Sequence, residues 1–291
     1  MHKIVIHYKK SQVRYRTAAR VEIELMKKIE VKVCGLKREK DLKICMSMGV
    51  DILGFVVEYP LPVPWNMSSA DALPLLKLVN NSDNSPYNHR HFEQGLQPKG
   101  FTDGLTEGLN NDFTEGFTKT LSRSCIVTGG SPGKVIELAQ ILKPSMVQLH
   151  YRETLSDTII ITEKLRKENI DVIKTIPPSI EERIYQFGTA DIEVIVRLLC
   201  DTGVYALLVD SRTPSNAANS SSQLDMDFCS QIVRLSSKPV IIAGGINADN
   251  VCAILSLTGA EYIDIMTGVE KSPGEKDKGL LADLMNAIIY Y

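Results

Sequence analysis

The sequence predicts one α/β domain built as a closed barrel of eight parallel strands. From residue 30 onward, short runs rich in Val, Ile and Leu alternate with longer stretches that have the apolar period of a helix. Eight such pairs occur, which is the count of a TIM (β/α)8 barrel. The chain has 291 residues and is 44% hydrophobic, so it can bury a core of that size.

The eight predicted strands are short, bounded by turn residues, and apolar nearly throughout, as expected for strands that are covered on both faces. In chain order they are 30–35, 51–58, 123–129, 146–150, 171–176, 205–211, 239–245 and 262–268.

A predicted helix follows each strand, and several of these helices end at a glycine, where the chain turns through a left-handed conformation. The predicted helical stretches are 39–49, 69–79, 133–143, 155–168, 192–203, 227–237, 248–259 and 279–289. A doubly wound open sheet is the alternative. It would usually have fewer strands and a G-x-G-x-x-G after the first, whereas Cys-Gly-Leu stands there in this chain.

Composition excludes several classes of protein and site. The formal charge of −2 gives no electrostatic reason to expect nucleic acid or an anionic membrane as partner. No apolar run has the roughly 18–20 residues that span a bilayer, and no signal-peptide core is present, so we expect a cytoplasmic protein. The six cysteines form no C-x-x-C pair and the five histidines no cluster, so the sequence gives no support for a metal site.

Two segments do not fit the repeat. Residues 1–25 precede the first strand and are expected to be an N-terminal extension, with Met1 or Met26 as the start and the barrel over 26–291. Residues 81–121 are rich in Asn, Gly and Thr and contain an imperfect repeat, "FTDGLTEGL" then "FTEGFTKTL". We expect a low-complexity insertion there rather than a lid, because nothing in it suggests chemistry.

The active site of this barrel lies at the carboxyl ends of the strands. Cys34 is the only one of the six cysteines at such an end, and at the other positions a small buried hydrophobe is the expected role. The other polar or glycine residues at strand ends are Gln148, His150, Lys174, Asp210, Ser211, Gly244, Gly245, Asp264, Thr267 and Gly268.

Glycines after the last two strands predict a phosphate site. "AGGINADN" contains Gly244 and Gly245, and "MTGVEKSPG" contains Thr267 and Gly268. Backbone N–H groups of these two loops are the usual phosphate ligands of the fold, and glycine lets the backbone approach closely.

The same pieces resemble one family. "KVCGLKREKDLKICMSMGVDILGFV", "VQLHYRE", "VIKTI", "LLVDS", "PVIIAGGINADNV" and "IDIMTGVEKSPGEKD" occur in order across residues 31–277 and are similar to phosphoribosylanthranilate isomerase, a ribulose-phosphate-binding barrel of tryptophan biosynthesis. The resemblance implies an Amadori rearrangement of N-(5'-phosphoribosyl)anthranilate to 1-(2-carboxyphenylamino)-1-deoxyribulose 5-phosphate, without cofactor, by a monomer or homodimer.

By this resemblance, Asp210 is the general acid that protonates the ring oxygen and Cys34 is the general base that takes the C2 proton. The thiol would need a pKa near neutrality, and Asp210 would need to be partly protonated. Gln148, His150 and Asp264 are expected to line the substrate pocket, although His150 also fits a structural role.

Two departures from the family concern substrate recognition. Where the family has an arginine for the anthranilate carboxylate, this chain has "YPLPVPWNMSS", and Trp65 offers stacking without charge. The loop after the sixth strand, "PSNAANSSSQLDMDF", lacks the family's glycines. An isomerase for another aminosugar phosphate, a non-catalytic or regulatory barrel for a phosphorylated metabolite, and an epimerase or aldolase using Lys174 therefore stay open as alternatives.

Overall fold

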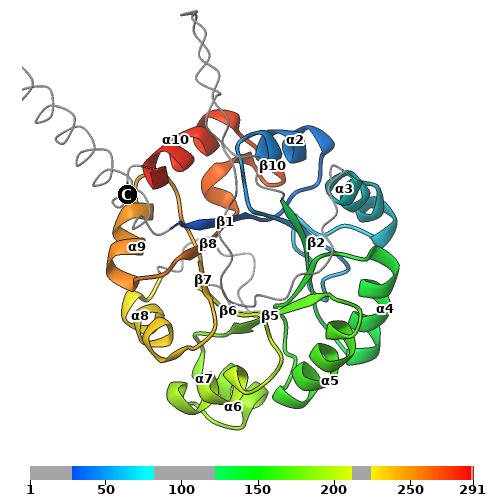
Figure 1. Ribbon diagram of the computed structural model, residues 1–291, viewed down its shortest axis with the longest axis vertical. Coiled ribbons are helices and arrows are strands. Elements are labelled where there is room, and N and C mark those ends of the chain that lie inside the picture. The colour runs from blue at the N-terminus through cyan, green and yellow to red at the C-terminus, as the bar shows by residue number, and fades with distance from the viewer. Residues whose placement is uncertain (1–27, 82–121, 212–223, 290) are drawn as a thin grey trace, which may run out of the picture.

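The computed structural model describes residues 28–81, 122–211, 224–289 and 291, which form a closed barrel of eight parallel strands. Each strand pairs with the next along the chain, and the first pairs with the last, so the sheet has no edge. Figure 1 looks along the barrel and shows the helices as a ring outside the strands. The predicted TIM barrel is confirmed. The predicted extension over 1–25 and residues 82–121 of the predicted insertion lie outside the described residues.

The strands of the barrel are β1 (Glu30–Val33), β2 (Ile52–Val56), β3 (Arg123–Thr128), β4 (Met146–Leu149), β5 (Asp171–Ile176), β6 (Ala206–Asp210), β7 (Val240–Ala243) and β8 (Tyr262–Ile265). The helices are α2 (Glu39–Ser47), α3 (Ser69–Asn81), α4 (Pro132–Leu142), α5 (Leu155–Arg166), α6 (Ile180–Phe187), α7 (Ile192–Cys200), α8 (Met226–Leu235), α9 (Val251–Thr258) and α10 (Lys278–Ile289). After β8 come a short 3₁₀ turn (Thr267–Val269) and a hairpin of β9 (Glu270–Ser272) and β10 (Glu275–Lys276).

Helix α6 lies between β5 and α7 and is an additional helix that the eight predicted strand–helix pairs do not include. Its signals are nevertheless local: the Ser179 side chain accepts a hydrogen bond from the Glu182 N–H at the start, and Gly188 ends the helix in a left-handed conformation. The predicted turn at Gly259 is of the same kind, with φ of 70°. Gly203 does not have this role, because α7 ends at Cys200 with a right-handed Asp201 as its cap.

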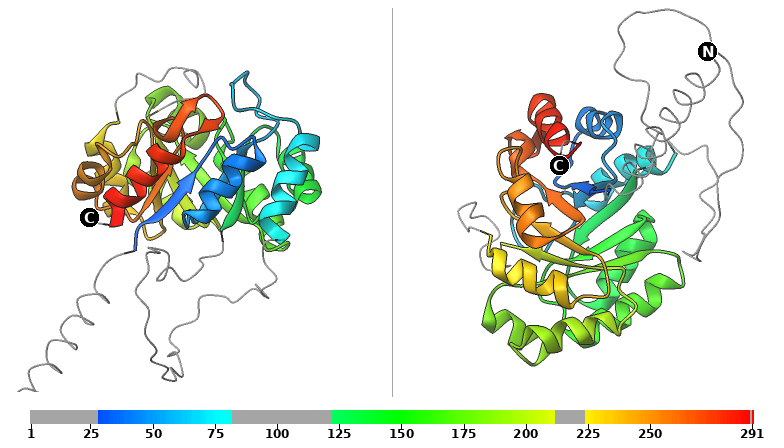
Figure 2. Two further views of the ribbon diagram at one scale, coloured as in Figure 1. Left: turned by 90° about the horizontal axis from the view of Figure 1, so that it is seen from above. Right: turned by 60° about the vertical axis from the view of Figure 1, so that its left-hand side comes forward.

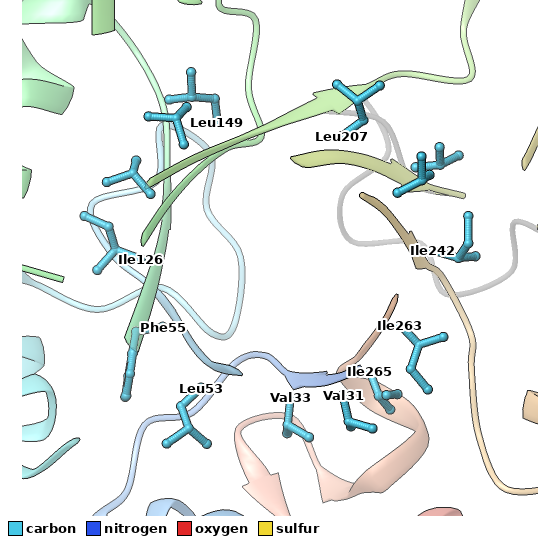
Figure 3. Packing of buried hydrophobic residues seen from close by; sticks show 14 of the residues in the cluster. Val31, Val33, Leu53, Phe55, Ile126, Leu149, Leu207, Ile242, Ile263 and Ile265 are labelled. Atoms are coloured by element: carbon cyan, nitrogen blue, oxygen red, sulfur yellow. The ribbon is translucent and has the colours of Figure 1, made fainter. Parts of the chain in front are cut away.

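Side chains alternate between two sides of the strands. Figure 3 shows Val31, Val33, Leu53, Phe55 and Ile126 pointing away from the barrel axis, into the layer between strands and helices. A second buried cluster fills the inside of the barrel and includes Ile52, Cys125, Met146, Ile173, Leu208 and Ile241. The interior of the barrel is therefore a packed core, and this core supports the loops at both ends of the barrel.

In the side view, the barrel is short and is wrapped by helices along its whole height (Figure 2). Among the residues described, none of the helices combines the length and the apolar character that crossing a bilayer requires.

Candidate active site

A pocket opens at the carboxyl ends of the strands and encloses about 560 Å³ of empty space, part of it open to solvent. Its polar lining consists of Cys34, Gln148, His150, Asp210 and Asp264. Its apolar lining includes Val56, Tyr59, Val63, Trp65, Val127 and Met266. All six residues expected from the sequence to act on or hold the substrate, apart from the phosphate ligands, thus meet in one cavity of a size that suits a small molecule.

Cys34 directly follows the last residue of β1 and is 5% exposed. Its N–H donates to the Ile265 carbonyl at 2.8 Å, and the next residue, Gly35, turns the chain away with φ of 75°. On β2, a Cβ added at Gly54 would lie 2.8 Å from the Cys34 Sγ, so this glycine leaves the space that the thiol occupies. Cys34 is consequently fixed, with its sulfur at the pocket wall.

The pKa of the Cys34 thiol is raised, whereas the role of general base calls for a pKa nearer neutrality. Burial is the largest cause, and the carboxylate of Asp264 acts in the same direction. The ammonium groups of Lys32 and Lys276 oppose both and lower the pKa, but they do not overcome burial. Cys34 therefore carries its proton at neutral pH.

The other cysteines do not reach the pocket. Cys45, Cys125 and Cys229 are fully buried, and burial raises the pKa of each to about 12. They are small hydrophobes in the core, as expected from their positions. Cys34 is thus the one cysteine lining the pocket among the residues that the structure describes.

Asp210 is the last residue of β6 and is 7% exposed. Its Oδ2 lies 3.7 Å from the Nε2 of His150. On the other side of that ring, the Gln148 amide nitrogen lies 2.8 Å from Nδ1. An amide nitrogen can only donate, so Nδ1 accepts and a neutral His150 carries its proton on Nε2, facing Asp210. His150 therefore lies beside the expected general acid, Asp210, and also lines the pocket.

Trp65 closes one side of the pocket and is 6% exposed. Its indole N–H donates to both carboxylate oxygens of Glu270, at 3.0 and 3.1 Å, and Glu270 also pairs with Lys276 at 2.7 Å. The Trp65 ring packs so closely on Gly35 that a Cβ there would lie 2.7 Å from Cδ1. The indole is held rigidly and presents an apolar face, and the pocket lining in the described part of the chain contains neither Lys nor Arg.

Sequence reasoning missed Tyr59, which also lines the pocket. Its hydroxyl donates to the His150 carbonyl at 2.8 Å, and its ring meets those of His150 and Tyr151 edge to face. Tyr59 comes three residues after β2 ends at Val56 and directly follows the predicted strand 51–58, but it was not counted among the polar or glycine residues at the strand ends. It ties the loop after β2 to the loop after β4.

The residues predicted to hold phosphate lie in two adjoining loops after β7 and β8. Gly244 and Gly245 have φ of 115° and 65°, which side chains rarely adopt. A Cβ on Gly268 would lie 1.9 Å from the Ile246 carbonyl oxygen, so the two loops touch backbone to backbone. Thr267 and Gly268 are half-buried, while Gly245 is exposed. These glycines permit a close approach of one loop to the other, which is the arrangement a shared anion site needs.

Lys174 does not reach the pocket, which corrects its assignment as a strand-end candidate for a Schiff base. Its side chain is fully buried and its Nζ lies 3.4 Å from Glu153 and 2.9 Å from the Gln186 oxygen, on α6. Burial lowers its pKa, against the opposing effect of Glu153. Its strand neighbour Thr175, by contrast, faces inward and lies 3.1 Å from His150 Nδ1. Lys174 therefore points to the helices.

Two buried acceptors in the pocket have no hydrogen-bond partner: Oε1 of Gln148 and Oδ1 of Asp264. Buried polar atoms are normally satisfied, so these two are suited to hydroxyl or amine hydrogens of a ligand. Within the described residues, no group of three or more His, Cys, Asp or Glu side chains is placed to hold a metal ion.

Comparison with known proteins gives one consistent family. Residues 130–287 match the family model described as N-(5'phosphoribosyl)anthranilate (PRA) isomerase. The N-(5'-phosphoribosyl)anthranilate isomerase of Methanosarcina acetivorans is 24% identical over 254 residues, covering 86% of this chain and 89% of that protein. The isomerase of the same name from Methanocaldococcus jannaschii is 26% identical over 268 residues, covering 89% and 96%.

Solved structures agree in fold. The phosphoribosyl anthranilate isomerase of Thermus thermophilus superposes with a TM-score of 0.60 at 20% identity, covering 90% of this chain and 99% of its own. A phosphoribosyl anthranilate isomerase in complex with reduced 1-(o-carboxyphenylamino)-1-deoxyribulose 5-phosphate gives 0.59 at 18%, covering 90% and 100%. A thiamine phosphate pyrophosphorylase from Pyrococcus furiosus gives 0.53 at 15%, covering 91% and 97%. The barrel is thus shared beyond one activity.

Proposed function

The chain belongs to the N-(5'-phosphoribosyl)anthranilate isomerase family, and on that premise we propose that it converts N-(5'-phosphoribosyl)anthranilate to 1-(2-carboxyphenylamino)-1-deoxyribulose 5-phosphate in tryptophan biosynthesis. The observation that carries this proposal is the presence of Cys34 and Asp210 in one pocket, on strands β1 and β6. An acid and a base on different sides of one small cavity are what an aldose–ketose rearrangement requires.

The reaction proceeds in two proton transfers. Asp210 gives a proton to the furanose ring oxygen as the C1–O bond breaks, which opens the ring and leaves an iminium at C1. Cys34, as the thiolate, then takes the C2 proton, and the electrons of the C–H bond form the enamine. Tautomerisation to the aminoketose then moves a proton from the C2 hydroxyl to C1, which oxidises C2 and reduces C1 within one molecule, so no external oxidant or reductant is needed. Exchange with solvent removes the proton from Cys34 and returns one to Asp210, which restores the base and the acid.

The neighbouring polar residues hold the sugar. His150 Nε2–H faces Asp210 and stabilises its carboxylate once the proton has left. The unpaired oxygens of Gln148 and Asp264 accept hydrogen bonds from sugar hydroxyls or from the secondary amine. The loops carrying Gly244, Gly245, Thr267 and Gly268 bind the phosphate through backbone N–H groups and the Thr267 hydroxyl.

Trp65 and the apolar wall accept the aryl ring of the substrate. Tyr59 and Met266 lie with Trp65 in the same lining, and together they offer aromatic and polarisable contacts to a planar ring. The partner of the protein is therefore a phosphorylated small molecule. The solved relatives include a Thermotoga maritima isomerase described as dimeric and its generated monomers, and we propose a monomer or homodimer here.

Complementation of an isomerase-deficient tryptophan auxotroph tests the proposal. The wild-type chain should restore growth, while Cys34→Ala and Asp210→Asn should not, because each removes a step worth about 10²–10⁴-fold in rate. Cys45→Ala is the matched control, since that thiol is buried away from the pocket, and it should complement. Soluble, folded wild-type protein that neither complements nor converts the substrate in vitro would contradict the proposal.

A barrel that binds a phosphorylated metabolite without turnover is the second candidate, favoured by Trp65, which brings no charge to the described pocket lining. Calorimetric binding of the aminoketose phosphate together with no turnover at any pH from 6 to 10 would select it. Turnover that depends on Cys34 would exclude it.

A further inference from the structure

A fully buried lysine lies inside the barrel, directly below the pocket, and the reaction described above does not use it. Lys32 belongs to β1, is 1% exposed, and stands two positions before Cys34. Residues two apart on a strand share a face, so both side chains point to the barrel interior, whereas Val31 and Val33 point to the helices (Figure 3).

Lys32 is bound to the floor of the pocket by one short ion pair. Its Nζ lies 2.7 Å from Oδ2 of Asp264, a residue that the strand register places directly beside it on β8. Asp264 uses one oxygen for this pair, and its other oxygen, Oδ1, is buried without a partner. Asp264 therefore has one oxygen paired with Lys32 and one oxygen without a hydrogen-bond partner, and the residue lines the pocket.

A purely structural role does not account for the buried ion pair between Lys32 and Asp264. The surroundings in the barrel are apolar, including Ile52, Ile173 and Ile241, and burying a charge pair among such residues is costly compared with burying aliphatic residues. A pair retained for packing would also be expected to satisfy both carboxylate oxygens. A positive charge two positions before the pocket cysteine, held by a carboxylate residue that also lines the pocket, indicates a role in the chemistry.

We propose that Lys32 is a positioning residue for the proposed isomerase reaction: its ammonium, fixed by Asp264 below the pocket, stabilises the thiolate of Cys34 during proton transfer. The inference rests on the proposed function, since it assigns a purpose to the thiolate. Lys32 touches neither substrate nor reacting atoms and acts only through Cys34 and Asp264.

The charges around Cys34 decide the sign of the effect. Burial raises the Cys34 pKa, Lys32 is the largest opposing influence, Asp264 adds to burial, and Lys276 opposes it more weakly. Burial is the largest single influence on the pKa of Lys32 and lowers it, but the charge and hydrogen bond of Asp264 together with the charges of Cys34 and Cys125 raise the pKa overall, so the ammonium persists across the working pH range. The titratable groups that face Cys34 from the surrounding elements are Lys32 on β1, Cys125 on β3, His150 after β4, Asp210 on β6, Asp264 on β8 and Lys276 on β10.

The test measures the titration of Cys34 without requiring turnover. Full-length protein is treated with iodoacetamide at a series of pH values, and the alkylation rate of the Cys34 peptide is followed by mass spectrometry. Thiolate is the reacting form, so the rate reports its fraction. Lys32→Met removes the charge at similar volume, Asp264→Asn removes the opposing carboxylate, and Lys174→Met removes an equally buried ammonium on the outer face of the sheet.

Lys32→Met should move the Cys34 titration to higher pH by about one unit and slow alkylation at pH 7.5 about tenfold, since one unit is tenfold in thiolate at a pH below the pKa. Asp264→Asn should move it to lower pH. Lys174→Met should leave it at the wild-type position. The alkaline limb of kcat/KM should move with the alkylation midpoint in Lys32→Met, which a loss of packing would not produce.

A Cys34 titration that is the same in Lys32→Met and wild type overturns the inference, even when activity falls. If Lys32→Met does not fold, Lys32→Gln decides, because its amide can still donate a hydrogen bond to Asp264 but carries no charge and must raise the midpoint; an unchanged or lowered midpoint overturns the inference. Wild-type protein without isomerase activity would instead contradict the proposed function, and the alkylation series remains readable in that case.

Discussion

The contact between the loops after β7 and β8 makes the phosphate site open to a specific perturbation. A Cβ built on Gly268 would lie 1.9 Å from the Ile246 carbonyl oxygen, and such contacts do not occur below 3.0 Å. Gly268→Ala must therefore separate the two backbones by at least about 1.1 Å. A displacement of that size at a substrate-positioning element costs about 10²-fold in rate. We expect kcat/KM to fall by about that factor, mainly through KM.

The control is Gly259→Ala, at the end of α9. Gly259 has φ of +70° and nothing within 4 Å of an added Cβ, so the substitution strains only the backbone. It should lower the free energy of unfolding by about 1–2 kcal/mol and leave kcat/KM unchanged.

Steady-state kinetics of both variants, with urea denaturation to establish that they are folded, give the readout. If Gly268→Ala keeps kcat/KM within threefold of wild type while folded, the loops after β7 and β8 do not form the phosphate site together.

Three further predictions follow from named contacts. The N-phenyl analogue of the substrate, which lacks the carboxylate, should lose less than tenfold in kcat/KM, because Trp65 provides no charge; a loss of hundredfold would show a charged contact worth about 1.5–3 kcal/mol. Lys174→Met should lower the free energy of unfolding by about 3–5 kcal/mol in urea, since it leaves Glu153 buried without its cation, while borohydride with a carbonyl ligand should trap no adduct on wild-type Lys174. The pKa of Cys125 is raised by burial to about 12, against about 8.5 when unfolded, so its stabilising contribution is complete below pH 8.5 and is lost as pH rises towards 12. Wild type should therefore lose stability more steeply above pH 8.5 than Cys125→Ala, by about 1.4 kcal/mol per pH unit, and equal slopes in urea titrations would contradict this.

The alternation of apolar runs and helical stretches determined the fold by itself. Each run needs two covered faces, and eight runs with eight helices satisfy this by closing the sheet. Because the fold places the carboxyl ends of all strands together, the same count located Cys34 and Asp210 at one end of the barrel. The family motifs lie at those ends, so the expected site residues could be read before any coordinates.

Only the tertiary structure decided which way each strand residue points. In a buried parallel strand both faces are apolar, so alternation cannot be read from the sequence, and nothing there showed that Lys174 points away from the pocket. The structure turns Lys174 to the helices and Lys32 to the barrel interior. The charged partners of the site could not be read from the sequence either, because they are distant along the chain. Asp264 pairs with Lys32 from 232 residues away, and Glu270 accepts the hydrogen bond of the Trp65 indole from 205 residues away. The charge on Cys34 depends on burial and on these long-range partners, which exist only when the barrel closes.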